Sequence, residues 1–179
     1  GDNYLSGQLD DVRIYNRALS ASEVANLANG NPSTGSGVYT LASALTVSGS
    51  LALYDSTLDV SSSSYGVTVS GSWINAGDFK KQSGTVTLDG SGQSLSGNTV
   101  FNNLTKTVTN GQTLKFDYMG RQSVSGALTL RGVASNLLSL RSSKTGSAAN
   151  LMLDGSAGTQ TMSYLDVKDN DASGGAERD

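Results

Sequence analysis

From residue 38 onward, apolar and polar residues alternate in short runs along the chain. A period of two is typical of β-strands that bury one face, and Gly, Ser, Asn or Asp interrupts each run within a few residues. The runs are 45–47, 51–53, 58–60, 67–69, 86–88, 114–116, 128–130, 151–153 and 165–167. Residues 38–179 are therefore predicted to be all-β.

The strand-and-turn phrase Val-Ser-Gly is repeated at 47–49, 69–71 and 124–126. The first two copies lie 22 residues apart, and the phrase Leu-Asp-Gly at 88–90 returns at 153–155, after 65 residues, close to three times that spacing. A repeat of this size indicates a solenoid. The third Val-Ser-Gly does not fit the spacing, so the repeat is imperfect.

A coil of about 22 residues has room for three short strands that rise about 3.3 Å per residue. This geometry predicts a right-handed parallel β-helix, in which Val, Leu and Phe stack inward and small residues form the corners. The alternative fold is a pair of short β-sandwich domains in series, with hairpins at the Asn-Gly and Asp-Gly turns. Parallel strand pairing would distinguish the β-helix from the sandwiches.

The first 30 residues have a different pattern. Residues 9–15 alternate as a half-buried strand, and residues 20–28 combine a capping box with apolar residues at helical intervals. The sequence therefore predicts a strand followed by a short helix. Residues 31–37 are rich in turn formers and are predicted to be a linker to the solenoid.

A dense motif runs through this N-terminal segment, and it resembles the C-terminal end of a laminin-G-like or concanavalin A-like jelly-roll domain. The residues that carry it are Gly7, Leu9, Asp10, Asp11, Val12, Arg13, Ile14, Tyr15, Arg17, Ala18, Leu19, Ser20, Glu23 and Val24. The resemblance covers residues 1–30 alone. It implies that the other jelly-roll strands are missing, so the chain is expected to be a segment of a longer protein.

The later phrases at 84–93, 99–105 and 163–175 are of low complexity and rich in Gly, Thr, Asn and Asp. They resemble the β-helical repeat regions of large bacterial surface adhesins and autotransporter passengers. This resemblance covers residues 38–179, and such regions often lie beside laminin-G-like domains. It implies an extracellular or cell-surface location.

Composition removes several kinds of chemistry. The chain has no histidine and no cysteine, which excludes imidazole acid–base catalysis, thiol nucleophiles, disulfides and the usual zinc sites. The net charge is −3, and the basic doublet Lys80-Lys81 is too small for a nucleic-acid surface. No apolar run approaches the length of a membrane span.

Acidic residues near the end of the chain are a candidate cation site. Asp166, Asp169, Asn170 and Asp171 place oxygen ligands close together, and Ca²⁺ binds such ligands. The simpler interpretation is a solvated turn after a strand. Asp89 and Asp154 each stand in a Leu-Asp-Gly phrase, where an Asp-Gly turn is the favoured interpretation.

Two alternative functions depend on other side chains. Paired carboxylates could cleave polysaccharides, but neither Asp55 with Asp59 nor Asp78 with Lys80 forms a recognisable motif, so we predict that the chain is not an enzyme. Exposed aromatic rings could stack on sugars in a carbohydrate-binding module, although burial in the strands is favoured. The aromatic candidates are Trp73, Tyr39, Tyr54, Tyr65, Tyr118 and Tyr164.

The predicted solenoid and the two resemblances together imply a structural or adhesive segment of a large secreted or cell-surface bacterial protein. It would form a rigid stalk or filament, with end-to-end self-association. The expected partners are neighbouring domains of the same protein, further copies of the chain and surface glycans, with no nucleic acid and no membrane span. No catalytic, cofactor-binding or metal-binding residue is assigned, and Ca²⁺ is kept as a candidate only for the cluster from Asp166 to Asp171.

Overall fold

A computed structural model describes residue 24 and residues 37–153 and 158–171. The predicted jelly-roll end at 1–30 and nearly all of the linker at 31–37 lie outside the described residues, as does Asp154. Residues 37–153 and 158–171 contain strands and turns and no helix.

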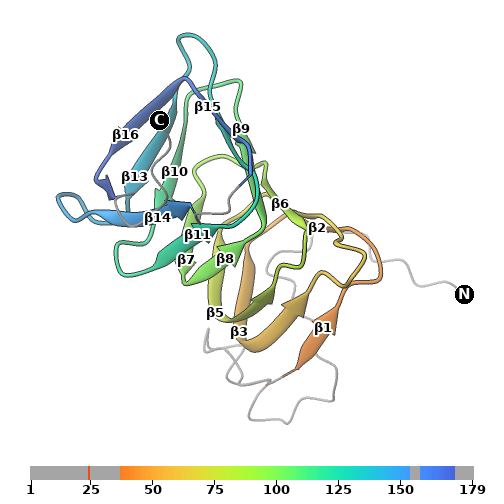
Figure 1. Ribbon diagram of the computed structural model, residues 1–179. Helices are drawn as coiled ribbons and strands as arrows, with labels where there is room; N and C mark the ends of the chain where they lie inside the picture. The colour runs from red at the N-terminus through yellow and green to blue at the C-terminus, as the bar shows by residue number, and fades with distance from the viewer. Residues whose placement is uncertain (1–23, 25–36, 154–157, 172–179) are drawn as a thin grey trace, which may run out of the picture.

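The described strands form three sheets (Figure 1). Sheet A contains β1 (Val38–Thr40), β3 (Leu51–Asp59), β5 (Trp73–Lys80), β7 (Ser94–Gly97), β10 (Gln112–Phe116), β13 (Leu138–Ser142) and β16 (Leu165–Lys168). Sheet B contains β2 (Leu45–Val47), β4 (Val67–Val69), β6 (Thr85–Leu88), β9 (Asn103–Thr107), β12 (Leu128–Arg131) and β15 (Gln160–Ser163). Sheet C contains β8 (Thr99–Phe101), β11 (Arg121–Val124), β14 (Ala149–Leu153) and β17 (Asn170–Asp171).

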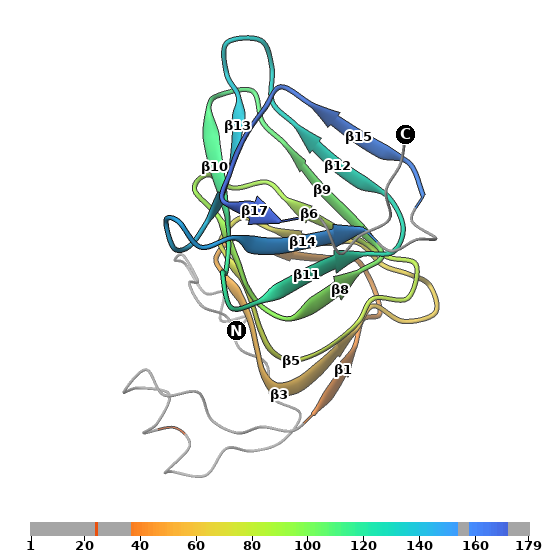
Figure 2. The same cartoon turned by 60° about the vertical axis from the view of Figure 1, so that its left-hand side comes forward.

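Every pairing between these described strands is parallel. A coil runs from sheet B through sheet A to sheet C, as in β6, β7 and β8, and the chain then returns to sheet B at β9. Figure 2 shows the three sheets as three walls of one prism. The prediction of an all-β parallel solenoid is confirmed, and the alternative of tandem antiparallel sandwiches is wrong.

The core is a column of stacked apolar side chains. In sheet A, Trp73 of β5 lies between Leu51 of β3 and Leu95 of β7, and in sheet B a continuous inward rank runs through all six strands. That rank consists of the apolar residues Leu45, Val67, Val86, Leu104 and Leu128, and it ends at the polar Gln160. Burying these ranks removes apolar surface from water in every coil, which is the main force that holds the coils together.

The repeated phrase now has a structural explanation. At 47–49 and 69–71 it follows a strand of sheet B, and the two copies stack: the amide of Ser70 donates to Val47 O at 2.9 Å and that of Gly71 to Gly49 O at 2.8 Å. A Cβ on Gly71 would lie 2.4 Å from the carbonyl carbon of Gly49, so glycine allows the coils to approach.

The third copy, at 124–126, follows a strand of sheet C instead. Its Ser125 amide donates to Phe101 O, which lies at the corner between sheets C and B. The two Leu-Asp-Gly phrases also begin on different walls, because Leu88 ends β6 in sheet B and Leu153 ends β14 in sheet C. Their spacing of 65 residues is therefore not a whole number of coils, although it is close to three times the 22-residue spacing.

Candidate functional site

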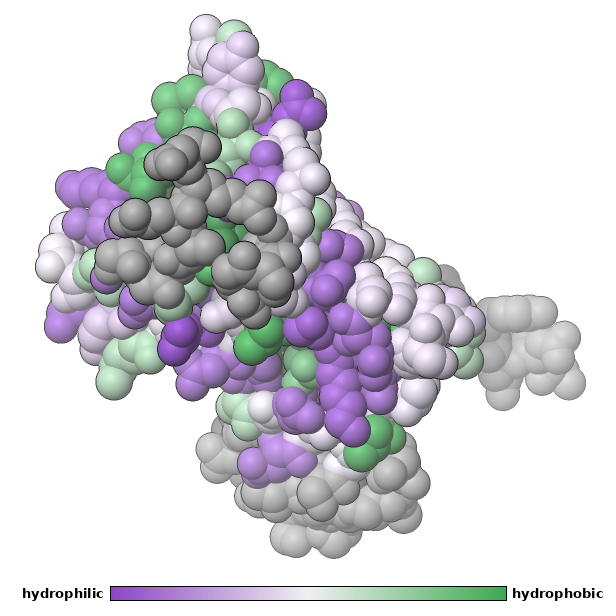
Figure 3. Space-filling model, in the orientation of Figure 1, coloured by the Kyte–Doolittle hydropathy of each residue, from purple (hydrophilic) through white to green (hydrophobic). Residues whose placement is uncertain are grey.

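The last described coil leaves core positions open. Met162 of β15 pairs with Leu130, which is 0% exposed, but Met162 itself is 49% exposed. Val167 of β16 likewise pairs with Leu140, which is 4% exposed, while Val167 is 55% exposed. The same inward positions thus change from buried to open in a single step along the stack. Green apolar residues are visible at this end of the molecule in Figure 3.

This open end also has strand edges. β15, β16 and β17 are the last described strands of sheets B, A and C. β15 and β16 each pair with a described strand on one side only, and the backbone groups of the other edge can pair with another strand. Open strand edges beside exposed core positions are what the next coil of a solenoid would cover.

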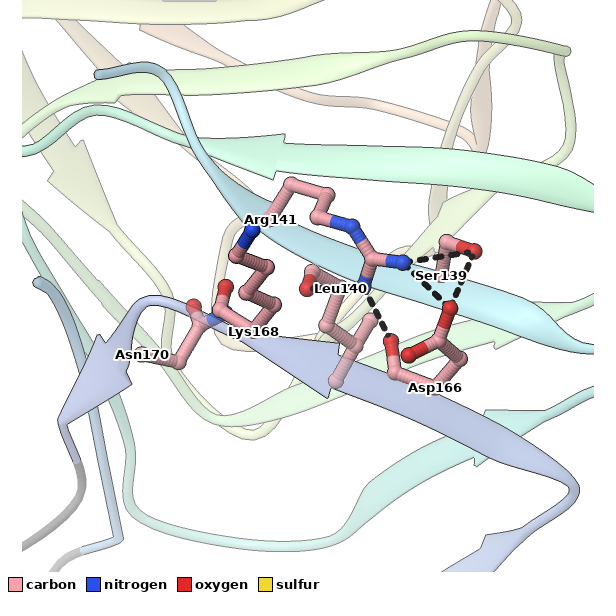
Figure 4. Close-up of polar contacts among 6 residues, drawn as sticks. All are labelled: Ser139, Leu140, Arg141, Asp166, Lys168 and Asn170. Carbon is pink, nitrogen blue, oxygen red and sulfur yellow. Dashed lines mark hydrogen bonds and ion pairs between the residues drawn. The ribbon is translucent and has the colours of Figure 1, made fainter. Parts of the chain in front are cut away.

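Asp166 of the predicted cation cluster is held by Arg141. The guanidinium of Arg141 forms an ion pair with the Asp166 carboxylate and donates to Asp166 O at 2.6 Å (Figure 4). It also donates to Leu140 O at 2.9 Å and contacts the hydroxyl of Ser139. These bonds join β13 to β16, so Asp166 fastens the last coil to the coil before it.

The other members of the cluster have separate partners. The Asp169 carboxylate accepts a hydrogen bond from the Gly146 amide at 3.1 Å, and Asp169 has a φ of 55° at the corner between β16 and β17. The side-chain amide of Asn170 donates to Lys168 O at 2.8 Å. Across the described residues, no group of three or more acidic side chains, histidines or cysteines is placed to hold a metal ion. The turn interpretation accounts for Asp169 and Asn170.

Cations form an outward rank on sheet A. Lys115, Arg141 and Lys168 are in direct register on β10, β13 and β16. Like charges opposite one another in a sheet repel, and Asp166 offsets part of that repulsion through Arg141. Each of these cations directly follows an inward apolar residue, namely Leu114, Leu140 or Val167. This alternation assigns the cations to the outward face, and the strand register then shows that they form one rank.

The residues of the proposed carboxylate pairs lie on β3 and β5. Asp55 is exposed, with a φ of 47°, at the register irregularity within β3. Asp59 accepts hydrogen bonds from Gln82 at 3.0 Å and from the Ser61 amide at 2.9 Å, and the bond from Gln82 lowers the pKa of Asp59. Asp78 is exposed on β5, and Asp89 accepts from the hydroxyl of Ser70 at 2.8 Å. Asp59 and Asp89 therefore each bond to a side chain of a neighbouring coil, and Asp59 also accepts from its own turn.

The aromatic candidates do not form one platform. Trp73 is fully buried, its indole N–H donates to Thr99 Oγ1 at 3.1 Å, and its ring packs on Phe79 and Phe101. Of the tyrosines, Tyr39, Tyr54 and Tyr65 are half-buried, whereas Tyr118 and Tyr164 are exposed. The core interpretation is confirmed for Trp73, which cannot stack on a sugar.

The two exposed tyrosines lie at different corners. Tyr118 follows β10 and lies under the ammonium of Lys144, which is 4.8 Å from the ring centroid. Tyr164 stands between β15 and β16 with a φ of 53°. The tyrosines therefore form no ladder on one face of the described solenoid.

A buried polar pair was missed in the sequence. Lys106 of β9 is fully buried, and its Nζ donates to Gly90 O at 2.7 Å and to Gln93 Oε1 at 2.6 Å. Gln93 is also buried, and its Nε2 donates to Val69 O at 2.8 Å and to Gly71 O at 2.6 Å. Burial lowers the pKa of Lys106 to about 8, against a smaller opposing effect of Asp89.

The alternation of Leu104, Lys106 and Val108 is the signal that could have found this pair, because it assigns Lys106 to the inward face. Among the described residues, no helix has the length and apolar character needed to cross a membrane. Comparisons with protein families, with curated proteins and with solved structures found no match for this chain.

Proposed function

We propose that this chain is a non-catalytic structural and adhesive segment of a large secreted or cell-surface bacterial protein. It acts as a rigid stalk, and its last coil receives a further coil, either from a second copy or from a neighbouring domain of the same protein. Surface glycans are a further class of partner in this proposal. The observation that carries it is the open last coil.

Three features support this function. The inward ranks continue through every described coil, which favours a stiff rod over a flexible chain. Met162 and Val167 occupy core positions but are about half exposed, and covering them would bury further apolar area. The edges of β15 and β16 supply backbone donors and acceptors in the register of a parallel stack.

The test changes the open end without changing the rest of the stack. In the variant Met162→Lys/Val167→Lys, two charges replace the exposed core positions. The matched control is Val100→Lys/Met119→Lys, because Val100 and Met119 are also exposed apolar residues but lie on β8 and at a corner, away from this end.

Sedimentation velocity over a range of protein concentrations measures the association. We expect the wild type and the control to form end-to-end oligomers as concentration rises, and the Met162/Val167 variant to remain monomeric because a charge cannot be buried unpaired at that interface. A wild type that stays monomeric at every concentration would contradict end-to-end docking. Equal loss of association in the control would show that another surface is responsible.

A further inference from the structure

Lys106 and Gln93 bring a primary amine against a carboxamide inside the solenoid. The contact joins two consecutive coils, because Gln93 immediately precedes β7 and Lys106 lies on β9, in the next coil. A buried lysine is usually paired with a carboxylate, since an isolated buried ammonium is costly. Here the partners are a side-chain amide and a backbone carbonyl, which are neutral.

We propose that Lys106 and Gln93 form an intramolecular isopeptide bond in the folded chain. The neutral amine of Lys106 attacks Cδ of Gln93, so that the Nζ–Cδ bond forms and the Cδ–Nε2 bond breaks. One proton passes from Nζ to Nε2, which leaves as ammonia. The product is a secondary amide, and the step needs no oxidant, reductant or second substrate.

The reacting atoms are already close. Nζ lies 2.6 Å from Gln93 Oε1, and the carbonyl bond is about 1.23 Å long, so Nζ is no more than about 3.8 Å from Cδ. Distances of about 3 to 3.5 Å are typical of pairs positioned for reaction, and this upper limit is within a few tenths of an ångström of that range. The fold therefore removes most of the entropic cost of bringing these two groups together.

The surroundings favour both the nucleophile and the leaving group. Because burial lowers the pKa of Lys106 to about 8, the neutral amine becomes the major form above that pH. The leaving nitrogen, Nε2, already donates to Val69 O and Gly71 O, and these two oxygens stabilise the positive charge that grows when Nε2 takes up a proton. Bulk water is excluded, since Gln93 is 1% exposed and Lys106 is 0% exposed, and competing hydrolysis is therefore suppressed.

The bond would strengthen the solenoid against a pulling force. It ties the corner before β7 to the inner face of β9, so the two coils could not separate unless a covalent bond broke. The inference is independent of end-to-end docking, because the bond forms within one copy.

Mass spectrometry tests the proposal directly on the whole chain. Wild-type protein is kept folded at pH 9, and a second portion is kept unfolded in concentrated denaturant at the same pH. We expect the folded portion alone to lose the mass of one ammonia. Tryptic digestion should then fail after Lys106, because an acylated lysine is not cleaved, whereas cleavage after the exposed Lys115 proceeds as an internal control.

The variant Lys106→Met separates this reaction from loss of ammonia elsewhere, for example at the Asn110-Gly111 turn. Lys106→Met should keep its full mass while the wild type loses ammonia, and Gln93→Ala should regain cleavage after Lys106. Because the folded wild type is itself decisive, the test does not depend on whether either variant folds. Folded wild type that keeps its full mass and is cleaved after Lys106 after prolonged incubation would overturn the proposal.

Discussion

Sheets A and B are parallel stacks wound from the same coils, but they use their outward positions differently. In sheet B a single outward rank is threonine in every described coil: Thr46, Thr68, Thr87, Thr105, Thr129 and Thr161. In sheet A the corresponding rank changes along the stack from serine to cations: Ser50, Ser72 and Ser94, then Lys115, Arg141 and Lys168.

The hydrogen bonds of the two ranks also differ. Ser72 Oγ accepts from the Ser94 amide at 3.1 Å and from the Ser94 hydroxyl at 2.9 Å, and Ser50 Oγ accepts from the Ser72 amide at 3.0 Å. Within the described part of the chain, no hydrogen bond joins the hydroxyls of the threonine rank. The serine rank of sheet A thus links its coils through side chains, whereas the threonine rank of sheet B depends on backbone pairing and on the β-propensity of threonine.

The largest single loss of stability is expected from the inward ranks of the two sheets. Trp73 in sheet A and Val69 in sheet B are both 0% exposed, but Trp73 also packs on two phenylalanine rings and donates a hydrogen bond. Trp73→Ala should lower the free energy of unfolding by about 4 kcal/mol. Val69→Ala should lower it by about 2 kcal/mol, because it removes only two methyl groups. Urea unfolding measures both, and equal losses would mean that the aromatic contacts add nothing.

A smaller single loss is expected at the strand ends. Gly97 ends β7 in sheet A with a φ of 76°, and an added Cβ would lie 1.8 Å from Asn75 O. Gly66 precedes β4 in sheet B, where the nearest atom to an added Cβ is Thr85 O at 3.8 Å. Gly97→Ala should therefore lower the free energy of unfolding by about 3 kcal/mol, because alanine is strained at this positive φ and its Cβ would displace the neighbouring coil that contains Asn75.

Gly66→Ala is the matched control. It adds the same methyl group without a clash, and the unfolded chain loses conformational freedom, so its stability should be unchanged or raised by about 0.5 kcal/mol. Thermal unfolding of the two variants under one set of conditions compares them. If Gly66→Ala lost as much stability as Gly97→Ala, close contact with the neighbouring coil would not be the cause.

The walls of the solenoid could be predicted from sequence because alternation is local. Runs such as 67–69 and 86–88 place one residue out and two in, and the structure places Val67, Val69 and Leu88 in the core as expected. The route around each corner could not be predicted, because coils differ in length and the same small residues fit every corner. For this reason the Val-Ser-Gly phrase at 124–126, which does not fit the 22-residue spacing, ends a strand of sheet C and not of sheet B.

The candidate site was harder to predict, since it depends on which residues of different coils become neighbours. Asp166 was noted in the sequence for its acidic neighbours, but its actual partner, Arg141, lies 25 residues away and meets it only through the pairing of β13 with β16. Lys106 and Gln93 are 13 residues apart and meet across a corner. Coil lengths, which the sequence does not state, decide such pairs.

The smallest expected difference concerns the outward ranks themselves. Ser72→Ala removes the acceptor of two hydrogen bonds and leaves the Ser94 amide without a partner, so we expect a loss of about 1 kcal/mol in the free energy of unfolding. Thr87→Val keeps the shape of the side chain and removes only a hydroxyl that bonds to no described neighbour, so the change should stay within about 0.5 kcal/mol. Paired urea titrations resolve a gap of this size when the slopes agree, and a loss in Thr87→Val equal to that in Ser72→Ala would mean that the threonine hydroxyls also link the coils.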